Sequence, residues 1–153
     1  MPKQVSVKEA HSQMAGGATY VDVRTTREFV EGHPEGALNV PLFEPDEDTG
    51  MMQANPDFLR VMKANFAPDT PLLIGCEVGG RSMRAAQVLE AFGFTNVANV
   101  RGGYSGAQDP ATGRIVDPGW VSTGLPVEVK TPYGHTYRDL EIKANEAAGS
   151  SPE

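Results

Sequence analysis

The chain has 153 residues, of which 39% are hydrophobic and 22% are charged, a composition typical of a globular protein with one core. Its formal net charge is −7 and no stretch is rich in Lys and Arg, which argues against a nucleic-acid backbone as the main partner. The single cysteine excludes an internal disulfide, and no signal-peptide pattern or run of 18 apolar residues is present, so we expect a cytoplasmic protein with no membrane partner.

Strand and helix patterns alternate through the first hundred residues. Strands are indicated where β-branched, aromatic or other apolar residues concentrate, and they are expected at residues 4–6, 19–24, 37–40, 72–75 and 96–100. Helices are indicated by capping residues and by apolar residues at helical spacing, and they are expected at residues 7–15, 26–31, 56–66 and 82–92. Two polar, turn-rich stretches are expected to be loops, at residues 44–54 and 108–119.

Three of these helices have recognisable start signals. Ser6 with Glu9, and Thr25 with Glu28, have the spacing of a capping box, in which the two residues hydrogen-bond each other's backbone. Asn55 followed by proline predicts the cap of the third helix.

The alternation of strands and helices predicts an α/β fold with a mostly parallel central sheet and helices on both faces. In such sheets, ligands bind beyond the carboxyl ends of the strands. Asp22 lies at one such end and Cys76 directly follows another, so we expect the two to be neighbours. Asp22 then either supports the loop after Cys76 by hydrogen bonding or has a local role in a turn or at a helix start. Arg24 and Glu28 are expected to form a structural ion pair.

The C-terminal part of the chain has weaker patterns. Trp120 and Val121 are expected to pack back on the domain, residues 127–130 alternate like an edge strand, and residues 137–148 have a weak helical pattern. We therefore divide the chain into a domain of residues 1–127 and a C-terminal appendage of unknown role, residues 128–153.

The stretch around Cys76 concentrates the chemistry. A buried strand, a thiol, two glycines and a helix follow one another, and this order lets backbone N–H groups and the helix N-terminus converge on one point. Such a point favours a thiolate over a thiol, and the thiolate is the reactive form. A buried structural cysteine is the alternative.

Several motifs resemble the rhodanese family, in the order that this family shows. They are Asp22-Val23-Arg24, Glu28-Phe29, Gly32-His33, Glu35-Gly36-Ala37 and Asn39-Val40-Pro41 at the N-terminal side, residues 76–82 as the active-site loop, and Gly102-Gly103-Tyr104 and Gly124-Leu125-Pro126 at the C-terminal side. The match runs from about Ser6 to Val127 and is closest in character to single-domain thiosulfate sulfurtransferases. It implies a rhodanese-like fold.

The resemblance implies sulfur transfer through Cys76 as the catalytic nucleophile. A donor such as thiosulfate would convert the thiolate to a persulfide, and a thiophilic acceptor, either cyanide or a thiol, would remove the sulfur. No metal or organic cofactor is implied. The residues implied to bind the substrate are Glu77, Val78, Gly79, Gly80, Arg81 and Ser82.

Two residues of the loop leave questions open. Arg81 either orients an anionic donor or braces the loop in an ion pair. Glu77 places a carboxylate beside the cysteine, where it repels an anionic donor such as thiosulfate.

Other functions remain as alternatives. The same persulfide would serve a sulfur carrier or interaction module with a protein acceptor. A rhodanese-like phosphatase or an arsenate reductase is less favoured, because the four residues between Cys76 and Arg81 form a shorter loop than a phosphate needs. A reductase would also need a second thiol from outside the chain.

Overall fold

The computed structural model describes residues 2–149; Met1 and the last four residues of the C-terminal segment lie outside the described part. Its helices are α1 (Val7–Ala15), α2 (Thr26–Glu31), α3 (Phe58–Asn65), α4 (Gly80–Ala91) and α5 (Tyr137–Gly149). Its strands are β1 (Lys3–Val5), β2 (Thr19–Asp22), β3 (His33–Pro34), β4 (Leu38–Asn39), β5 (Phe43–Pro45), β6 (Met52–Ala54), β7 (Leu72–Gly75), β8 (Val97–Val100), β9 (Ala107–Gln108), β10 (Ile115–Asp117) and β11 (Val127–Glu128).

A five-stranded parallel sheet forms the centre of the molecule, in the order β1-β8-β7-β2-β4. The predicted α/β fold with a parallel sheet is confirmed. Strand β7 is central and pairs with β2 and β8. Cys76, which follows β7, therefore leaves the sheet at the middle of its carboxyl edge, where a parallel α/β sheet presents its ligand sites.

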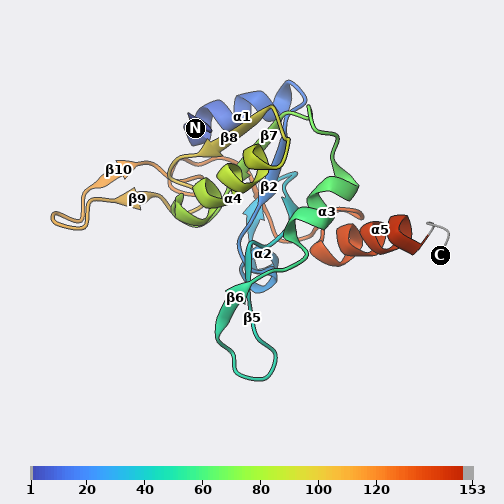
Figure 1. Ribbon diagram of the computed structural model, residues 1–153. Helices are drawn as coiled ribbons and strands as arrows, with labels where there is room; N and C mark the ends of the chain where they lie inside the picture. The colour runs from blue at the N-terminus through green and yellow to red at the C-terminus, as the bar shows by residue number, and fades with distance from the viewer. Residues whose placement is uncertain (1, 150–153) are drawn as a thin grey trace.

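Side chains alternate between two cores because successive residues of a strand point to opposite faces. On one face Leu72 and Ile74 of β7 join a core with α3, α4 and α5, and on the other face Leu73 joins a core with α1 and α2. Figure 1 shows the sheet strands running between these helices. Trp120 is buried in the second core with its ring edge against Tyr20, as predicted, whereas Val121 is exposed.

The two capping boxes are confirmed at Ser6 and Thr25, each with both reciprocal hydrogen bonds. The predicted cap at Asn55 is wrong. Helix α3 begins two residues later, after Asp57, because the Asn55 side chain accepts the backbone N–H of Asp57 and forms a turn instead.

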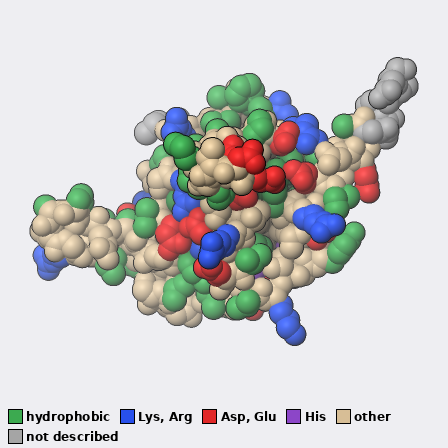
Figure 2. All heavy atoms as spheres, turned by 90° about the horizontal axis from the view of Figure 1, so that it is seen from below, with side chains coloured by type: hydrophobic (Ala, Val, Ile, Leu, Met, Phe, Trp, Pro, Cys, Tyr) green, Lys and Arg blue, Asp and Glu red, His purple; other side chains and the backbone are tan. Residues whose placement is uncertain are grey.

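Two antiparallel hairpins replace the predicted loops. Strands β5 and β6 pair within residues 43–54, and β9 and β10 pair within residues 107–117. Both hairpins extend away from the body in Figure 1, and Figure 2 shows the β9–β10 hairpin projecting from it. Their residues are mostly exposed and lack the hydrophobic alternation that marks a strand packed on a core.

The C-terminal segment is attached to the same body. Strand β11 pairs with β3, and Leu140 and Ala144 of α5 are buried in the core beside α3. Residues 128–149 thus complete a core, whereas the sequence offered only a weak helical pattern there. Within the described residues, none of the helices has the length and apolar character needed to cross a membrane.

Candidate active site

Cys76 lies buried at the end of β7, beneath the loop that leads into α4. Its Sγ accepts hydrogen bonds from the backbone N–H groups of Gly79 at 3.1 Å and Ser82 at 3.3 Å. Gly79 has a φ of +115°, which a residue with a side chain rarely adopts, and this conformation turns the loop into the helix. The sulfur therefore sits against two N–H donors at a helix N-terminus, an arrangement that stabilises negative charge on it.

A chain of polar side chains continues beneath the sulfur. Cys76 Sγ lies 3.3 Å from Ser82 Oγ, which lies 2.6 Å from Asn99 Oδ1 on β8. Asn99 Nδ2 in turn lies 3.2 Å from Gln4 Oε1 on β1. Ser82 and Asn99 are both buried, so the thiol is linked through two buried side chains to an exposed residue at the edge of the sheet.

The loop is held from behind by the segment after β8. The backbone N–H groups of Tyr104 and Ser105 donate to the carbonyl oxygens of Cys76 and Glu77, at 2.8 and 2.9 Å. A Cβ added at Gly103 would lie 2.3 Å from the Cys76 carbonyl oxygen, so only glycine permits this approach. A glycine at 103 is therefore a structural requirement of the loop.

A buried ion-pair cluster lies beside the loop. Arg24 donates to both oxygens of Asp22 with Nε, to Asp22 again with an NH2 nitrogen at 2.8 Å, and to Glu77 at 3.2 Å. Its guanidinium also donates to the Gly32 carbonyl and lies 4.3 Å from the centre of the Tyr104 ring. Burial opposes the charge of Arg24, but the hydrogen bonds and negative charges of Asp22 and Glu77 together outweigh it and raise the pKa of Arg24.

Two expectations about this cluster are corrected. Asp22 does not hydrogen-bond the loop directly; it binds Arg24, and Arg24 reaches the loop through Glu77. Arg24 does not pair with Glu28, although the two are four residues apart, because its side chain turns towards the sheet edge. The Glu77 carboxylate is paired with Arg24, which offsets the repulsion of an anionic donor that the sequence alone suggested.

Arg81 lies in an ion pair rather than over the sulfur. Its two terminal nitrogens donate to the two oxygens of Glu28, at 2.7 and 3.0 Å, and so join α4 to α2. Of the two open interpretations, the structure favours bracing of the loop. The Arg81 guanidinium lowers the pKa of Glu28 to about 2, with burial opposing and the Thr25 backbone N–H assisting.

We expect this ion pair to make stability sensitive to acid. The folded-state pKa of Glu28 is below its unfolded value, so its stabilising contribution is complete above the unfolded pKa and is lost as the pH falls from about 4.5 towards about 2. The Glu28→Gln variant has no carboxylate at this position and therefore lacks this pH-dependent stabilisation. Melting temperatures measured from pH 7 to pH 2 should show a gap between wild type and variant that closes in this window, and a gap of constant size would contradict the assignment.

Cavities lie on both sides of the loop. One of about 270 Å³ is lined by Arg24, Glu77, Tyr104 and their neighbours. Another, of about 590 Å³, lies between Val78 and the base of the β9–β10 hairpin, and Val78 is 51% exposed there. Gly80, the first residue of α4, is exposed beside it. Glu77 and Val78 thus line the cavities beside the loop, whereas Cys76 lies buried beneath it.

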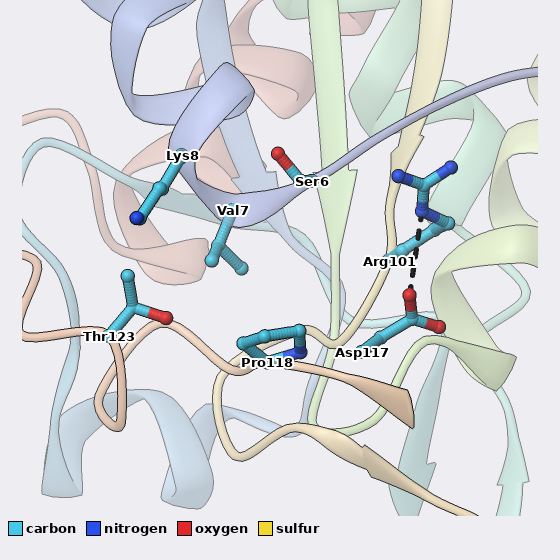
Figure 3. Close-up of a pocket in the computed structure, with 7 residues that line it drawn as sticks. All are labelled: Ser6, Val7, Lys8, Arg101, Asp117, Pro118 and Thr123. Carbon is cyan, nitrogen blue, oxygen red and sulfur yellow. Dashed lines mark ion pairs between the residues drawn. The ribbon is translucent and has the colours of Figure 1, made fainter. Parts of the chain in front are cut away.

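A separate cavity of about 410 Å³ lies at the N-terminus of α1, where Arg101 Nε is 3.6 Å from Asp117 Oδ1 (Figure 3). None of its lining residues belongs to the loop of residues 76–82, so we place the candidate active site at the loop. Within residues 2–149, no three His, Cys, Asp or Glu side chains are grouped in a way that would hold a metal ion.

The comparison with protein families decides the identity of the domain. The family model of the rhodanese-like domain matches residues 6–109, which include β2 to β9 and the whole loop after Cys76. This chain belongs to the rhodanese family. Residues 76–82 lie within the matched range.

Relatives of this rhodanese domain align with it in sequence over most of its length. It is 38% identical to Thiosulfate sulfurtransferase 16, chloroplastic, from Arabidopsis thaliana over 128 residues, which are 84% of this chain and 94% of that protein. It is 33% identical to the human Thiosulfate:glutathione sulfurtransferase over 101 residues, 65% of this chain and 88% of that one. The crystal structure of Rv0390 from M. tuberculosis superposes with a TM-score of 0.67 at 26% identity, covering 84% of this chain and 98% of that chain.

One sequence-based prediction is contradicted by these relatives. The plant relative is named as chloroplastic, so the expectation of a cytoplasmic location, which rested on the missing signal-peptide pattern, is wrong.

Sequence reasoning missed two residues of the site. Arg24 lies two residues after Asp22, and that spacing is the available signal, but in the sequence analysis Arg24 is assigned to a structural ion pair with Glu28. Asn99 gave no signal, because an asparagine inside a predicted strand reveals its role only when the neighbouring helix is placed against it.

Proposed function

We propose that this rhodanese domain is a sulfurtransferase that moves a sulfane sulfur from a donor such as thiosulfate to a thiophilic acceptor through a persulfide on Cys76. The observation that carries the proposal is the sulfur of Cys76 held against the N–H groups of Gly79 and Ser82. The sulfurtransferase names of the plant and human relatives support the same reaction, and the human name supports a small thiol as acceptor.

The reaction has two steps. The Cys76 thiolate attacks the outer sulfur of thiosulfate, an S–S bond forms to Cys76, and the original S–S bond breaks with its electron pair leaving on sulfite. The acceptor, cyanide or a thiolate, then attacks the terminal sulfur, and the electron pair of the broken bond restores the Cys76 thiolate. Charge and atoms balance in both steps, and neither step needs an added oxidant or reductant.

The loop residues have distinct proposed roles. The N–H groups of Gly79 and Ser82 stabilise negative charge on sulfur, and those of Glu77, Val78, Gly80 and Arg81 complete the cradle around a bound donor. Asp22 acts through Arg24 by holding the Glu77 side chain. A phosphatase would need the Arg81 guanidinium to bind the phosphate. In this structure the guanidinium is held by Glu28 in a bidentate ion pair, and this pairing supports sulfur transfer over a phosphatase function.

A second candidate function is a persulfide carrier for a protein acceptor. It is favoured by apolar side chains exposed next to the loop, namely Val78 in the loop and Ile115 and Val116 in the β9–β10 hairpin. A small acceptor needs no such surface, whereas a protein acceptor buries apolar area when it docks.

Intact mass spectrometry tests the sulfur transfer. After incubation with thiosulfate, the wild-type protein is expected to gain one sulfur, about 32 Da, and cyanide should remove it as thiocyanate. Cys76→Ala is expected to gain nothing. Because Cys76 is the chain's single cysteine, any gain by this variant would place the chemistry elsewhere.

The acceptor is tested on the loaded protein. Rapid removal of the sulfur by glutathione or cyanide supports the enzyme. A persulfide that forms but resists both small acceptors supports the carrier. Absence of the gain with thiosulfate and with other sulfane-sulfur donors would overturn both.

A further inference from the structure

We propose that Asn99 is a positioning residue that sets whether the Ser82 hydroxyl accepts a hydrogen bond from the Cys76 thiol or donates one to its thiolate. The inference deepens the proposed function and rests on it, since it concerns how the nucleophile of that reaction is made ready. It does not depend on which sulfur donor the protein uses.

The Ser82 hydroxyl has one proton and three polar neighbours. Asn99 Oδ1 at 2.6 Å and the Gly79 carbonyl at 3.1 Å accept from it, and the Cys76 thiol, with Sγ at 3.3 Å, donates to it. The shortest of these contacts is to Asn99. When the Ser82 hydroxyl donates its proton to Asn99 Oδ1, only a lone pair of the Ser82 oxygen faces the sulfur. In this arrangement Ser82 can accept a hydrogen bond from a protonated thiol but cannot donate one to a thiolate.

The thiolate needs the opposite polarity. A thiolate sulfur has no proton to give, so the Ser82 hydroxyl must donate its proton to the sulfur. If Asn99 Oδ1 still faces Ser82, this oxygen is then an acceptor without a donor. Turning the Asn99 amide by 180° places Nδ2 against Ser82 Oγ and Oδ1 towards Gln4, with almost no movement of heavy atoms. The amide of Gln4 can turn in the same way, and its exposed position lets it do so freely.

The four side chains therefore have two complete hydrogen-bonding arrangements. In one arrangement every bond points from Cys76 towards Gln4, and in the other every bond points from Gln4 towards Cys76. Burial of Ser82 and Asn99 excludes water as a substitute partner, which makes a mixed arrangement unfavourable. When the thiol ionises, its proton leaves to solvent, and the amide turn follows.

Charged and titratable groups around the sulfur come from three other elements. Tyr20 and the Asp22–Arg24 pair lie at β2, Glu77 lies in the loop, and Arg81 lies on α4. These groups also act on the thiolate, but they do so through space and not through Ser82. A test must therefore separate the two routes.

A double-mutant cycle on alkylation rates makes that separation. Asn99→Asp presents only acceptors to Ser82 when ionised, so it holds the hydroxyl in the arrangement that suits the thiol. The rate of iodoacetamide alkylation at pH 7, measured by intact mass, is expected to fall about tenfold, and the rate profile should move to higher pH. In a Ser82→Ala background the same substitution should change the rate less than threefold, since the route through Ser82 is gone.

A matched pair at the exposed end of the chain avoids a buried charge. Gln4→Glu can only accept from Asn99 and favours the thiol arrangement, whereas Gln4→Lys can only donate and favours the thiolate arrangement. At high salt, which screens exposed charges, alkylation of the Lys variant should be about threefold faster than that of the Glu variant. With Ser82→Ala the two should be equal.

The outcomes are distinct from those of the sulfur-transfer experiment, because alkylation needs no sulfur donor. Equal effects with and without the Ser82 hydroxyl would show action through space alone and would overturn the proposal, as would the absence of any difference between the two Gln4 variants. If the wild-type protein takes up no sulfur from any donor, but the alkylation rates still depend on Asn99 only when the Ser82 hydroxyl is present, the proposed function is overturned and the role of Asn99 stands.

Discussion

Replacing Arg24 with methionine is expected to destabilise the folded protein by about 3–5 kcal/mol, because it leaves a buried carboxylate without its partner. Arg24 and Asp22 have side-chain exposures of 3% and 2%, and Asp22 receives two of the guanidinium nitrogens as well as the Arg24 backbone N–H. The Gly32 carbonyl loses its donor in the same variant. Urea unfolding followed by circular dichroism measures the effect.

Matched variants separate the buried pair from charge removal in general. Arg27→Met removes an arginine with 89% side-chain exposure from a pair with Glu31, and it is expected to change stability by less than about 0.5 kcal/mol. The double variant Asp22→Asn with Arg24→Met should be more stable than Arg24→Met alone, because the uncompensated charge is gone. A loss below about 1 kcal/mol in Arg24→Met would contradict the burial of Asp22 described above.

Replacing Gly103 with alanine is expected to slow both alkylation of Cys76 and its loading with sulfur by about a hundredfold, because it displaces the loop that holds the sulfur. The added Cβ would lie 2.3 Å from the Cys76 carbonyl oxygen and 2.8 Å from the Glu77 carbonyl oxygen. Both are backbone atoms and cannot rotate away. The loop must therefore move, and the contacts of Sγ with Gly79 and Ser82 change with it.

A second glycine provides the control for backbone conformation. Gly113 in the β9–β10 hairpin has a φ of +73°, compared with +57° for Gly103, but nothing lies within 4 Å of an added Cβ there. Gly113→Ala is therefore expected to keep wild-type rates while bearing a similar conformational cost. Equal rates in Gly103→Ala and wild type would show that the loop tolerates displacement, and they would remove the structural reason given for this glycine.

Patterns that depend on neighbours in sequence were predicted well. The capping boxes at Ser6 and Thr25 use residues three apart, so their geometry is present in the sequence itself. The buried strand before Cys76 was found because it is an uninterrupted apolar run. The hairpins and the cap at Asn55 were not, because their polar residues satisfy backbone groups in several conformations with similar free energy.

Partners across the fold were predicted poorly. Arg24 and Glu28 satisfy the helical spacing for an ion pair, yet Glu28 binds Arg81, which is 53 residues away, and Arg24 binds Asp22 and Glu77. An exposed pair at helical spacing is worth only a few tenths of a kcal/mol, so a bidentate or buried partner from another element easily replaces it.

The amino-acid sequence by itself determined the parallel α/β architecture and the family, and it led to Cys76 as the proposed nucleophile, because strand and helix periodicity and the order of the motifs are properties of the chain. The tertiary structure decided the partners of Arg24, Glu28 and Arg81, and it placed Asn99 beneath Ser82. The physical reason is that charged and polar side chains find their lowest free energy through contacts between segments far apart in sequence, and local spacing carries no information about which segments will meet.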